Sequence, residues 1–187
     1  MTKRQWLFVL LVTAVISFSL GGQGIAGDDD KDRTCPLPIK VDVYTECQGA
    51  PCSPSTTDGG APYSSRFGTF RSSDISFATT TGLNWHPFNQ GAFGADLSGC
   101  IEVKRTGMYN FTLTSDDGSM LWIDGNLVVD NGDPHPPNTM SGSTSLTAGV
   151  HSFEVQFFEC CGGPSGVDLT LPQGVEYVCC KGCEDKH

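Results

Sequence analysis

Short apolar runs separated by clusters of Gly, Asp, Asn and Pro recur along the chain from residue 39 onward. Residues Ile39 to Tyr44 alternate between apolar and polar side chains, which is typical of a strand with one buried face. The same alternation recurs from Tyr109 to Leu113 and, most clearly, from Phe153 to Phe157. No segment of useful length after the first 26 residues has the 3.6-residue period of an amphipathic helix. The pattern therefore predicts an all-β fold, an antiparallel β-sandwich.

Two turn signals indicate where strands reverse direction. Asp124-Gly125-Asn126 lies between the apolar runs Met120–Ile123 and Leu127–Val129, and Asp-Gly between apolar runs is a strong hairpin signal. Thr147-Ala148-Gly149 predicts a second turn, in which the glycine supplies a permissive backbone. Two further strands are expected at residues 167–171 and 175–179.

The segment from residue 53 to residue 82 breaks this pattern. It is rich in Ser, Thr and Gly, with scattered aromatic residues at Tyr63, Phe67, Phe70 and Phe77. Such a composition is typical of loops. We therefore expect a long irregular excursion that docks on the domain through its aromatic rings and contributes no core strand.

The first 26 residues predict a secretory signal peptide. Lys3 and Arg4 precede a mostly apolar stretch from Trp6 to Leu20, and small residues follow it up to Ala26. The apolar stretch is short for a membrane span, which needs about 20 such residues. We expect cleavage near Ala26, with an uncleaved anchor as the alternative. The mature protein would then be secreted, without a membrane span, and would form a single domain over residues 35–183.

The charge of the chain restricts its partners. The formal net charge is -10 at pH 7. Removing Lys3 and Arg4 from the 11 basic residues leaves nine against 21 acidic ones, so the expected mature chain carries -12. Repulsion of that size argues against nucleic acid and anionic membranes as partners. The same acidity suits cation binding, and equally suits a surface whose charge only maintains solubility.

All nine cysteines follow the predicted cleavage point, with three before residue 53 and three after residue 178. In an oxidising compartment the default is disulfide formation, so we expect bridges that tie the two ends of the domain together. The odd count leaves one thiol free or paired with a second chain, which would give a disulfide-linked oligomer. The sequence leaves the pairing open among Cys35, Cys47, Cys52, Cys100, Cys160, Cys161, Cys179, Cys180 and Cys183.

Two acidic, glycine-containing loops each follow a predicted strand. The first, residues 115–119, contains the neighbours Asp116 and Asp117, and the second, residues 159–166, begins with Glu159. If both loops lie at the same end of the sandwich, three carboxylates converge, and oxygen-only ligands suit calcium, which takes about 6–8 of them. Adjacent side chains of a regular strand point to opposite faces. A loop, for instance one with a cis peptide bond, must therefore bring the two aspartates together.

The stretch from about residue 83 to residue 178 resembles the protective-antigen-type (PA-14) domain, a family found in yeast flocculin adhesins, bacterial adhesins and some glycosidases. The resemblance covers well over half of the expected mature chain. It rests on six motifs in family order, at Gly107–Phe111, Ser115–Ser119, Leu121–Gly125, Val129–Gly132, Leu146–His151 and Phe157–Glu159.

The resemblance implies a set of calcium ligands. In lectin members of the family, two neighbouring aspartates joined by a cis peptide bind calcium together with a second loop, and sugar hydroxyls occupy the remaining positions. This implies Asp116 and Asp117 as the aspartate pair, Glu159 as the side-chain ligand, and the backbone carbonyls of Cys161 and Gly163. Glu159 stands where the sugar-binding relatives carry an amide. The candidates for further sugar contacts are Trp85, His135 and Ser165.

The expected function is that of a secreted, calcium-dependent, lectin-like module that binds glycans or glycoproteins. The alternative is a calcium-stabilised extracellular structural or adhesion module without sugar binding. Taken alone, Asp116-Asp117 before Gly-Ser is also the pattern of an ordinary turn. For Trp122, packing in the core or at its rim is expected in preference to stacking on a sugar.

No enzymatic activity is expected from the sequence. No Ser/His/Asp or Cys/His arrangement stands out along the chain, and aspartates that share one ion are poor acid and base partners. Asn110-Phe111-Thr112 is a glycosylation sequon. Because the alternation of its strand places Asn110 on the solvent-facing side, the site is expected to be usable.

Overall fold

The computed structural model describes residues 37–47, 63–77, 93–160 and 165–181. Residues Thr34–His187 form one compact unit. No helix occurs among the described residues, so none of them forms a helix able to cross a membrane. The predicted signal peptide, Trp85, Cys161 and Gly163 lie outside the described residues.

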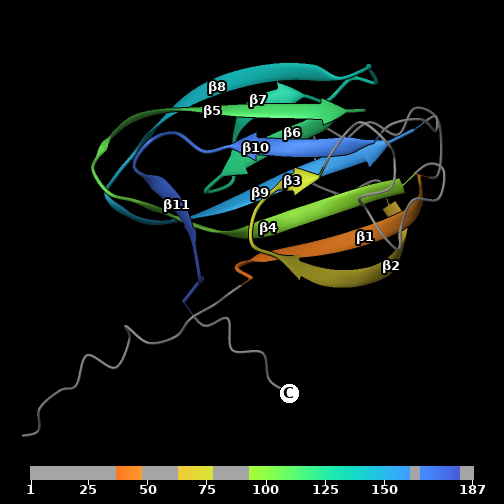
Figure 1. Ribbon diagram of the computed structural model, residues 1–187, viewed down its shortest axis with the longest axis horizontal. Coiled ribbons are helices and arrows are strands. Elements are labelled where there is room, and N and C mark those ends of the chain that lie inside the picture. Colours follow the sequence, from red (N-terminus) through yellow and green to blue (C-terminus); the bar gives the residue numbers. More distant parts are fainter. Residues whose placement is uncertain (1–36, 48–62, 78–92, 161–164, 182–187) are drawn as a thin grey trace, which may run out of the picture. The chain divides into compact units, whose positions relative to one another are not determined.

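The described strands form two antiparallel sheets (Figure 1). In the larger sheet the strand order is β2-β1-β4-β9-β6-β7, and β11 also pairs with β4. Its strands are β1 (Ile39–Cys47), β2 (Tyr63–Ser72), β4 (Phe93–Val103), β6 (Ser119–Ile123), β7 (Asn126–Asn131), β9 (Gly149–Glu159) and β11 (Val175–Val178). The smaller sheet has the order β3-β10-β5-β8, with β3 (Ser76–Phe77), β5 (Gly107–Asp116), β8 (Asn138–Leu146) and β10 (Gly166–Thr170).

Alternating apolar side chains of the two sheets form one core. Phe111 and Leu113 of β5 and Val155 and Phe157 of β9 are fully buried, as is Leu97 of β4. Burying each such side chain contributes about 1.5–3 kcal/mol relative to leaving it exposed. The predicted antiparallel β-sandwich is confirmed, and the alternation that predicted it is the pattern that builds its core.

The turns lie where the sequence predicted them. Asp124 and Gly125 link β6 to β7 with φ angles of 49° and 75°, the left-handed conformation that a two-residue type I′ hairpin turn requires. Gly149 begins β9 with φ 134°, a conformation that glycine adopts without steric cost. Asp-Gly and the isolated glycine were therefore reliable signals of chain reversal.

The prediction for residues 53–82 was wrong within the part that the structure describes. Strand β2 pairs with β1 along its length, so this segment extends the larger sheet. Its Ser- and Thr-rich composition suits an edge strand, which has only one neighbour and needs no continuous apolar face. The rings of Phe70 and Phe77 contact edge to face with centroids 6.1 Å apart, whereas the side chain of Phe67 is 58% exposed.

Strands β4 and β8 were not predicted. In β4 the small residues Ala95 and Gly99 at core-facing positions weaken the apolar alternation, although β4 lies between β1 and β9 in the larger sheet. Strand β8 consists mostly of exposed Ser, Thr and Asn side chains at the edge of the smaller sheet. Both strands are specified by their neighbours more than by their own sequence.

A disulfide joins Cys100 of β4 to Cys180, which follows β11. The two Cα atoms lie 5.2 Å apart, and the sequence separation is 80 residues. This bridge ties the C-terminal strand to the middle of the larger sheet, whereas the sequence suggested bridges between the two ends. The side chains of Cys35, Cys47, Cys52, Cys161 and Cys183 lie outside the described residues.

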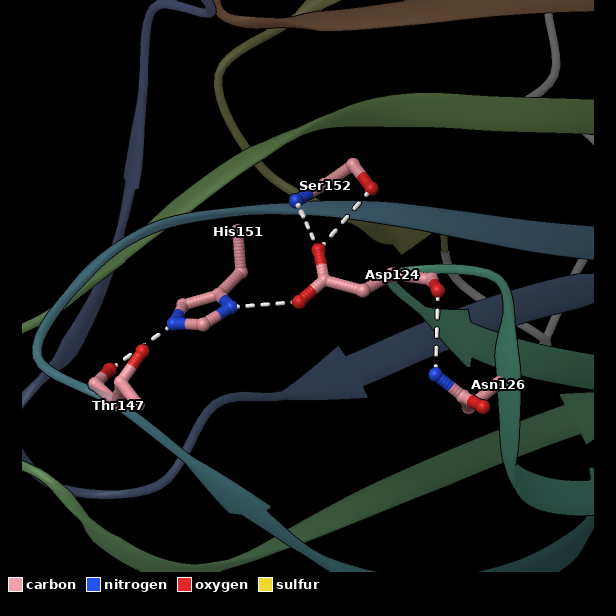
Figure 2. A network of polar contacts seen from close by, with 5 residues as sticks. All are labelled: Asp124, Asn126, Thr147, His151 and Ser152. Carbon is pink, nitrogen blue, oxygen red and sulfur yellow. Dashed lines mark hydrogen bonds and ion pairs between the residues drawn. The ribbon is translucent and has the colours of Figure 1, made fainter.

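A polar network joins the β6–β7 turn to the start of β9 (Figure 2). Ser152 donates to Asp124 Oδ1 through its backbone N, at 3.0 Å, and through Oγ, at 3.2 Å. His151 Nδ1 lies 2.6 Å from Asp124 Oδ2, and His151 Nε2 lies 2.9 Å from the Thr147 carbonyl oxygen. Because both ring nitrogens face acceptors, the network is complete only when the imidazole is protonated at both.

This network predicts a pH-dependent contribution to stability. The hydrogen bond to Asp124 is the main cause that raises the pKa of His151 above its usual value of 6.5. Burial alone would raise the pKa of Asp124, but the hydrogen bonds from His151 and Ser152 outweigh it and lower that pKa below 3.8. The stabilisation is therefore complete between about pH 4 and pH 6.5, and is lost as pH rises through the raised pKa of His151.

We expect wild type to lose up to about 1 kcal/mol of unfolding free energy between pH 6 and pH 8 relative to a His151→Asn variant. The exposure of Asp124, whose side chain is 45% accessible, keeps the effect small. Urea denaturation of both proteins at the two pH values measures it. Parallel stability curves for the two proteins would contradict the assignment of a charged imidazole.

Close packing between β8 and β7 gives a second prediction. A Cβ atom at Gly142 would lie 1.7 Å from the carbonyl oxygen of Val128, which is backbone and cannot rotate away. At Gly107, on the paired strand β5, an added Cβ would make only an ordinary contact of 3.7 Å. We expect Gly142→Ala to lower the unfolding free energy by about 3 kcal/mol and Gly107→Ala to change it by less than about 0.5 kcal/mol. Chemical denaturation of the two variants measures the difference, and equal values would contradict the packing.

Candidate metal centre

The ends of strands from both sheets meet at one end of the sandwich. Asp116 is the last residue of β5, and Glu159 is the last residue of β9. The start of β10 connects the two places, because Gly166 pairs with Asp116 shortly after the chain leaves Glu159. Strand pairing therefore brings Asp116 and Glu159, at the starts of the two acidic loops, to the same end of the sandwich, which is the condition on which the sequence argument for a shared site depended.

Three carboxylates converge at this place. The Asp116–Asp117 peptide bond is cis, as expected for neighbouring aspartates that face the same point. One carboxylate oxygen from each of Asp116, Asp117 and Glu159 lies within 4.8 Å of the other two. The residues are 8%, 8% and 3% exposed, respectively. Among the described residues this is the one group of three or more His, Cys, Asp or Glu side chains close enough to hold a metal ion.

Asp117 also connects the surrounding loops. Its Oδ1 accepts a hydrogen bond from the backbone N of His135 at 3.0 Å, and its Oδ2 accepts one from the backbone N of Cys160 at 3.0 Å. Hydrogen bonds to a carboxylate are stronger than neutral ones. One side chain thus holds the loop between β7 and β8 and the loop after β9 against the end of β5.

A buried polar network lies behind the carboxylates. Ser115 Oγ and Ser119 Oγ are 2.7 Å apart, and Asn131 Nδ2 donates to Ser115 Oγ at 3.0 Å. Asn138 Nδ2 in turn donates to Asn131 Oδ1 at 2.8 Å. A network in which each buried group has a partner holds its members in one arrangement. It fixes the end of β5, from which Asp116 and Asp117 project.

Gly118 follows the aspartates at a point of close approach. Its carbonyl oxygen accepts a hydrogen bond from the backbone N of Phe158 at 3.0 Å. A Cβ at this position would lie 2.2 Å from the Phe158 ring and 2.7 Å from the carbonyl oxygen of Gly132. Glycine is required here because the β5–β6 turn lies directly against β9.

The electrostatics of the cluster favour a cation. Burial, and next the charge of Asp117, raise the pKa of Asp116 above its usual value, while His135 has a smaller opposite effect. A cation among the three carboxylates would offset both the desolvation and the mutual repulsion. The donor set consists only of oxygen, which fits calcium better than zinc, whose sites use sulfur and imidazole.

The other residues predicted for the site have different positions. Ser165 is 3% exposed and precedes Gly166, the partner of Asp116 in strand pairing. His135 is half-buried, and its ring nitrogens lie 2.8 Å and 3.1 Å from the carbonyl oxygens of Pro136 and Asn131. Its connection to the cluster runs through its backbone. Asn110 is exposed on β5, where its Oδ1 accepts a hydrogen bond from Ser143 Oγ at 3.0 Å.

Sequence reasoning missed two groups that build the site. The backbone N–H groups of His135 and Cys160 carry no sequence signal, because every residue other than proline has one. The Ser115–Asn131–Asn138 network has a weak signal, since polar side chains at strand ends are common in exposed turns as well.

The structure also brings Asp124 against the adjacent residues His151 and Ser152, which places an aspartate, a histidine and a serine together. Asp124, His151 and Ser152 form the network of Figure 2. Ser152 Oγ donates to Asp124, however, and the second ring nitrogen of His151 faces the Thr147 carbonyl. A nucleophilic serine must donate to the histidine. The three residues therefore stabilise a turn and do not form a catalytic triad.

Comparison with known proteins identifies relatives of this fold. A family model described as "PA14 domain" matches residues 47–182. A solved PA14 sugar-binding domain from an RTX adhesin is 20% identical, with a TM-score of 0.55, and the match covers 76% of this chain and 93% of that one. The Epithelial Adhesin 9 A domain from Candida glabrata, solved in complex with Galβ1-4GlcNAc, is 14% identical with a TM-score of 0.53 and coverage of 76% and 85%.

Larger proteins also contain this fold. An anti-sigma factor domain-containing protein is 15% identical with a TM-score of 0.57, and the match covers 76% of this chain but only 46% of that one. Solved glycosidases match as well, and this chain covers 17% of a GH31 alpha-xylosidase from Xanthomonas citri. No curated protein matches the chain.

Proposed function

This chain belongs to the PA14 domain family, and from that premise we propose that it is a secreted, calcium-dependent module that binds carbohydrate. The observation that carries the proposal is the cluster of three buried carboxylates, whose oxygens lie within 4.8 Å of one another. Burying three like charges is costly unless a cation offsets them. The cluster is therefore best explained as a calcium site.

Asp116, Asp117 and Glu159 would hold the ion, with the carbonyls of Cys161 and Gly163 proposed as further ligands. Asp117 fixes the two flanking loops through His135 and Cys160, so that the ligands are held in place before the ion binds. Bound calcium would supply coordination positions that the protein leaves open, and neighbouring hydroxyls of a sugar would fill them. Glycans or glycoproteins are the proposed partners.

Two similar domains support the choice of carbohydrate. The RTX adhesin domain is described as sugar-binding, and the Epithelial Adhesin 9 A domain was solved with Galβ1-4GlcNAc. Secretion is proposed from the charged, apolar and small-residue pattern of the first 26 residues. It agrees with the disulfide between Cys100 and Cys180, since such bonds persist in oxidising compartments.

We propose a binding module and not an enzyme. The glycosidases with this fold are several times longer than the stretch that this chain matches, so their catalytic activity is not transferred by the likeness. The remaining alternative is a module that calcium stabilises without sugar binding, for which the same three carboxylates would suffice.

A glycan array that includes Galβ1-4GlcNAc tests the proposal directly. The protein is applied in calcium and in chelator, beside an Asp133→Asn variant that removes an exposed carboxylate outside the cluster. We expect at least one glycan that binds in calcium and not in chelator, and that the variant binds as the wild type does. If calcium raises thermal stability while no glycan is retained, the module is structural and the carbohydrate proposal is wrong.

A further inference from the structure

A second surface of the domain has the features of a ligand site. A groove with a volume of about 530 Å³ lies on the larger sheet. The strand register places five of its lining residues in one row across five adjacent strands, in the order Arg71, Lys40, Ser98, Glu154 and Trp122. Directly paired residues share one face of a sheet. This row alternates with core residues along its strands, so it lies on the face that points away from the core.

The depth of the groove follows from side-chain size. Ser98, in the middle of the row, has a short side chain and its neighbour Gly99 has none, and both residues line the groove. The long side chains of Lys40 and Arg71 flank them on one side, and Glu154 and Trp122 flank them on the other. Four steps between strands of about 4.8 Å make the row about 19 Å long. That length accommodates several linked sugar rings.

The chemistry of the lining suits a polyhydroxylated ligand. Trp122 is only partly buried, and an indole offers a flat apolar face together with an N–H donor. Glu154 Oε1 accepts a hydrogen bond from Gln156 Nε2 at 2.9 Å. Gln156 itself is 3% exposed, so a buried side chain orients the carboxylate. Lys40 Nζ is held 2.6 Å from Asp42.

We propose that this groove binds a linear oligosaccharide through Trp122, Glu154 and Lys40, without calcium. A sugar ring would lie against the indole, and its hydroxyl groups would exchange hydrogen bonds with the carboxylate and the ammonium group. Pockets of this size, with a few positioned polar groups beside an aromatic ring, are typical of small-ligand sites. The groove is separate from the metal cluster, because Glu154 and Glu159 are five residues apart on β9, or about 17 Å.

Isothermal titration calorimetry of the full chain in excess chelator tests this proposal. The probes are chitotetraose, which is neutral, and tetragalacturonate, which is acidic, each at up to about 10 mM so that millimolar affinities are measured. We expect at least one to bind. Trp122→Ala should weaken that binding at least about tenfold, a loss of about 1.4 kcal/mol. A preference for tetragalacturonate would place its carboxylates at Lys40 and Arg71.

A second variant and a control complete the design. Glu154→Gln keeps the shape of its side chain and should weaken binding even if Trp122→Ala fails to fold. Met108→Ala removes a side chain that is 68% exposed on the other sheet and should leave binding unchanged. The proposal would be overturned if neither probe gave a heat of binding, or if both groove variants bound the probe as tightly as wild type. Because chelator is present throughout, neither result depends on the calcium site.

Discussion

Asp117→Ala is expected to abolish calcium binding. The substitution removes one of the three carboxylates within 4.8 Å of one another, and it also removes the acceptor for the backbone N–H groups of His135 and Cys160. Wild type at a free calcium concentration of about 100 times Kd should gain about 2.7 kcal/mol of unfolding free energy. The variant should gain none, as measured by thermal or urea unfolding with calcium and with chelator.

Two matched variants separate the effect of the Asp117 charge from the effect of the hydrogen bonds that Asp117 accepts. Asp117→Asn keeps an acceptor oxygen for one loop but removes the charge, and it should lose most of the calcium response while remaining folded. Asp133→Asn removes a charge at an exposed position and should respond to calcium like wild type. If Asp117→Ala still gained about 2–3 kcal/mol of unfolding free energy in calcium, as expected for wild type, the ion would bind elsewhere.

The disulfide gives the second large effect. In the chain-entropy description, a bridge between residues 80 positions apart stabilises a protein by about 4.5 kcal/mol. The double variant Cys100→Ala/Cys180→Ala should therefore lose about 3–4.5 kcal/mol of unfolding free energy, or about 10 °C in melting temperature. Denaturant unfolding of both proteins under oxidising conditions measures the loss.

Reduction supplies the control for this prediction. In a thiol reductant the wild type loses the same cross-link, so the difference between wild type and the double variant should disappear. A difference below about 1 kcal/mol under oxidising conditions would show that the Cys100–Cys180 bond contributes little to the native protein.

The sequence predicted those parts of the fold in which local pattern and tertiary burial agree. Strand β9 alternates Phe153, Val155 and Phe157 with polar residues, and all three apolar residues are buried. Strand β4 is just as central, but the small residues Ala95 and Gly99 at its core-facing positions weaken its apolar period. Its conformation is set by pairing with β1 and β9 over most of its length. The conformation of such strands is specified by the neighbouring strands, so the local pattern of apolar residues does not predict them.

The sequence predicted the carboxylate side chains of the candidate site, but not the backbone N–H groups that hold one of them. The motif around Asp116 and Asp117, together with Glu159, identified the three carboxylates that the structure brings together. The N–H donors that hold Asp117 come from His135 and Cys160, 18 and 43 residues further along the chain. Their positions depend on how the loops fold, which no residue type specifies.

The position of Trp122 on the sheet could not be predicted from its own segment of the sequence. As a residue of a buried hairpin strand, it was expected to pack in the core or at its rim. The register places it opposite Glu154, in line with Ser98 and Lys40. Trp122 becomes a candidate ligand contact only when the strand pairing is known, and the sequence does not reveal that pairing.

A calcium titration tests the proposal that sugar and protein share one calcium ion. Calcium affinity is measured by calorimetry with and without a saturating concentration of a glycan identified on the array. If the sugar hydroxyls complete the ion's coordination, the glycan must tighten calcium binding by the same factor by which calcium tightens glycan binding. We predict such reciprocal tightening in wild type and its loss in Asp117→Ala. A calcium affinity that the glycan leaves unchanged would contradict the proposal, and would mean that the ion stabilises the loops without contacting the sugar.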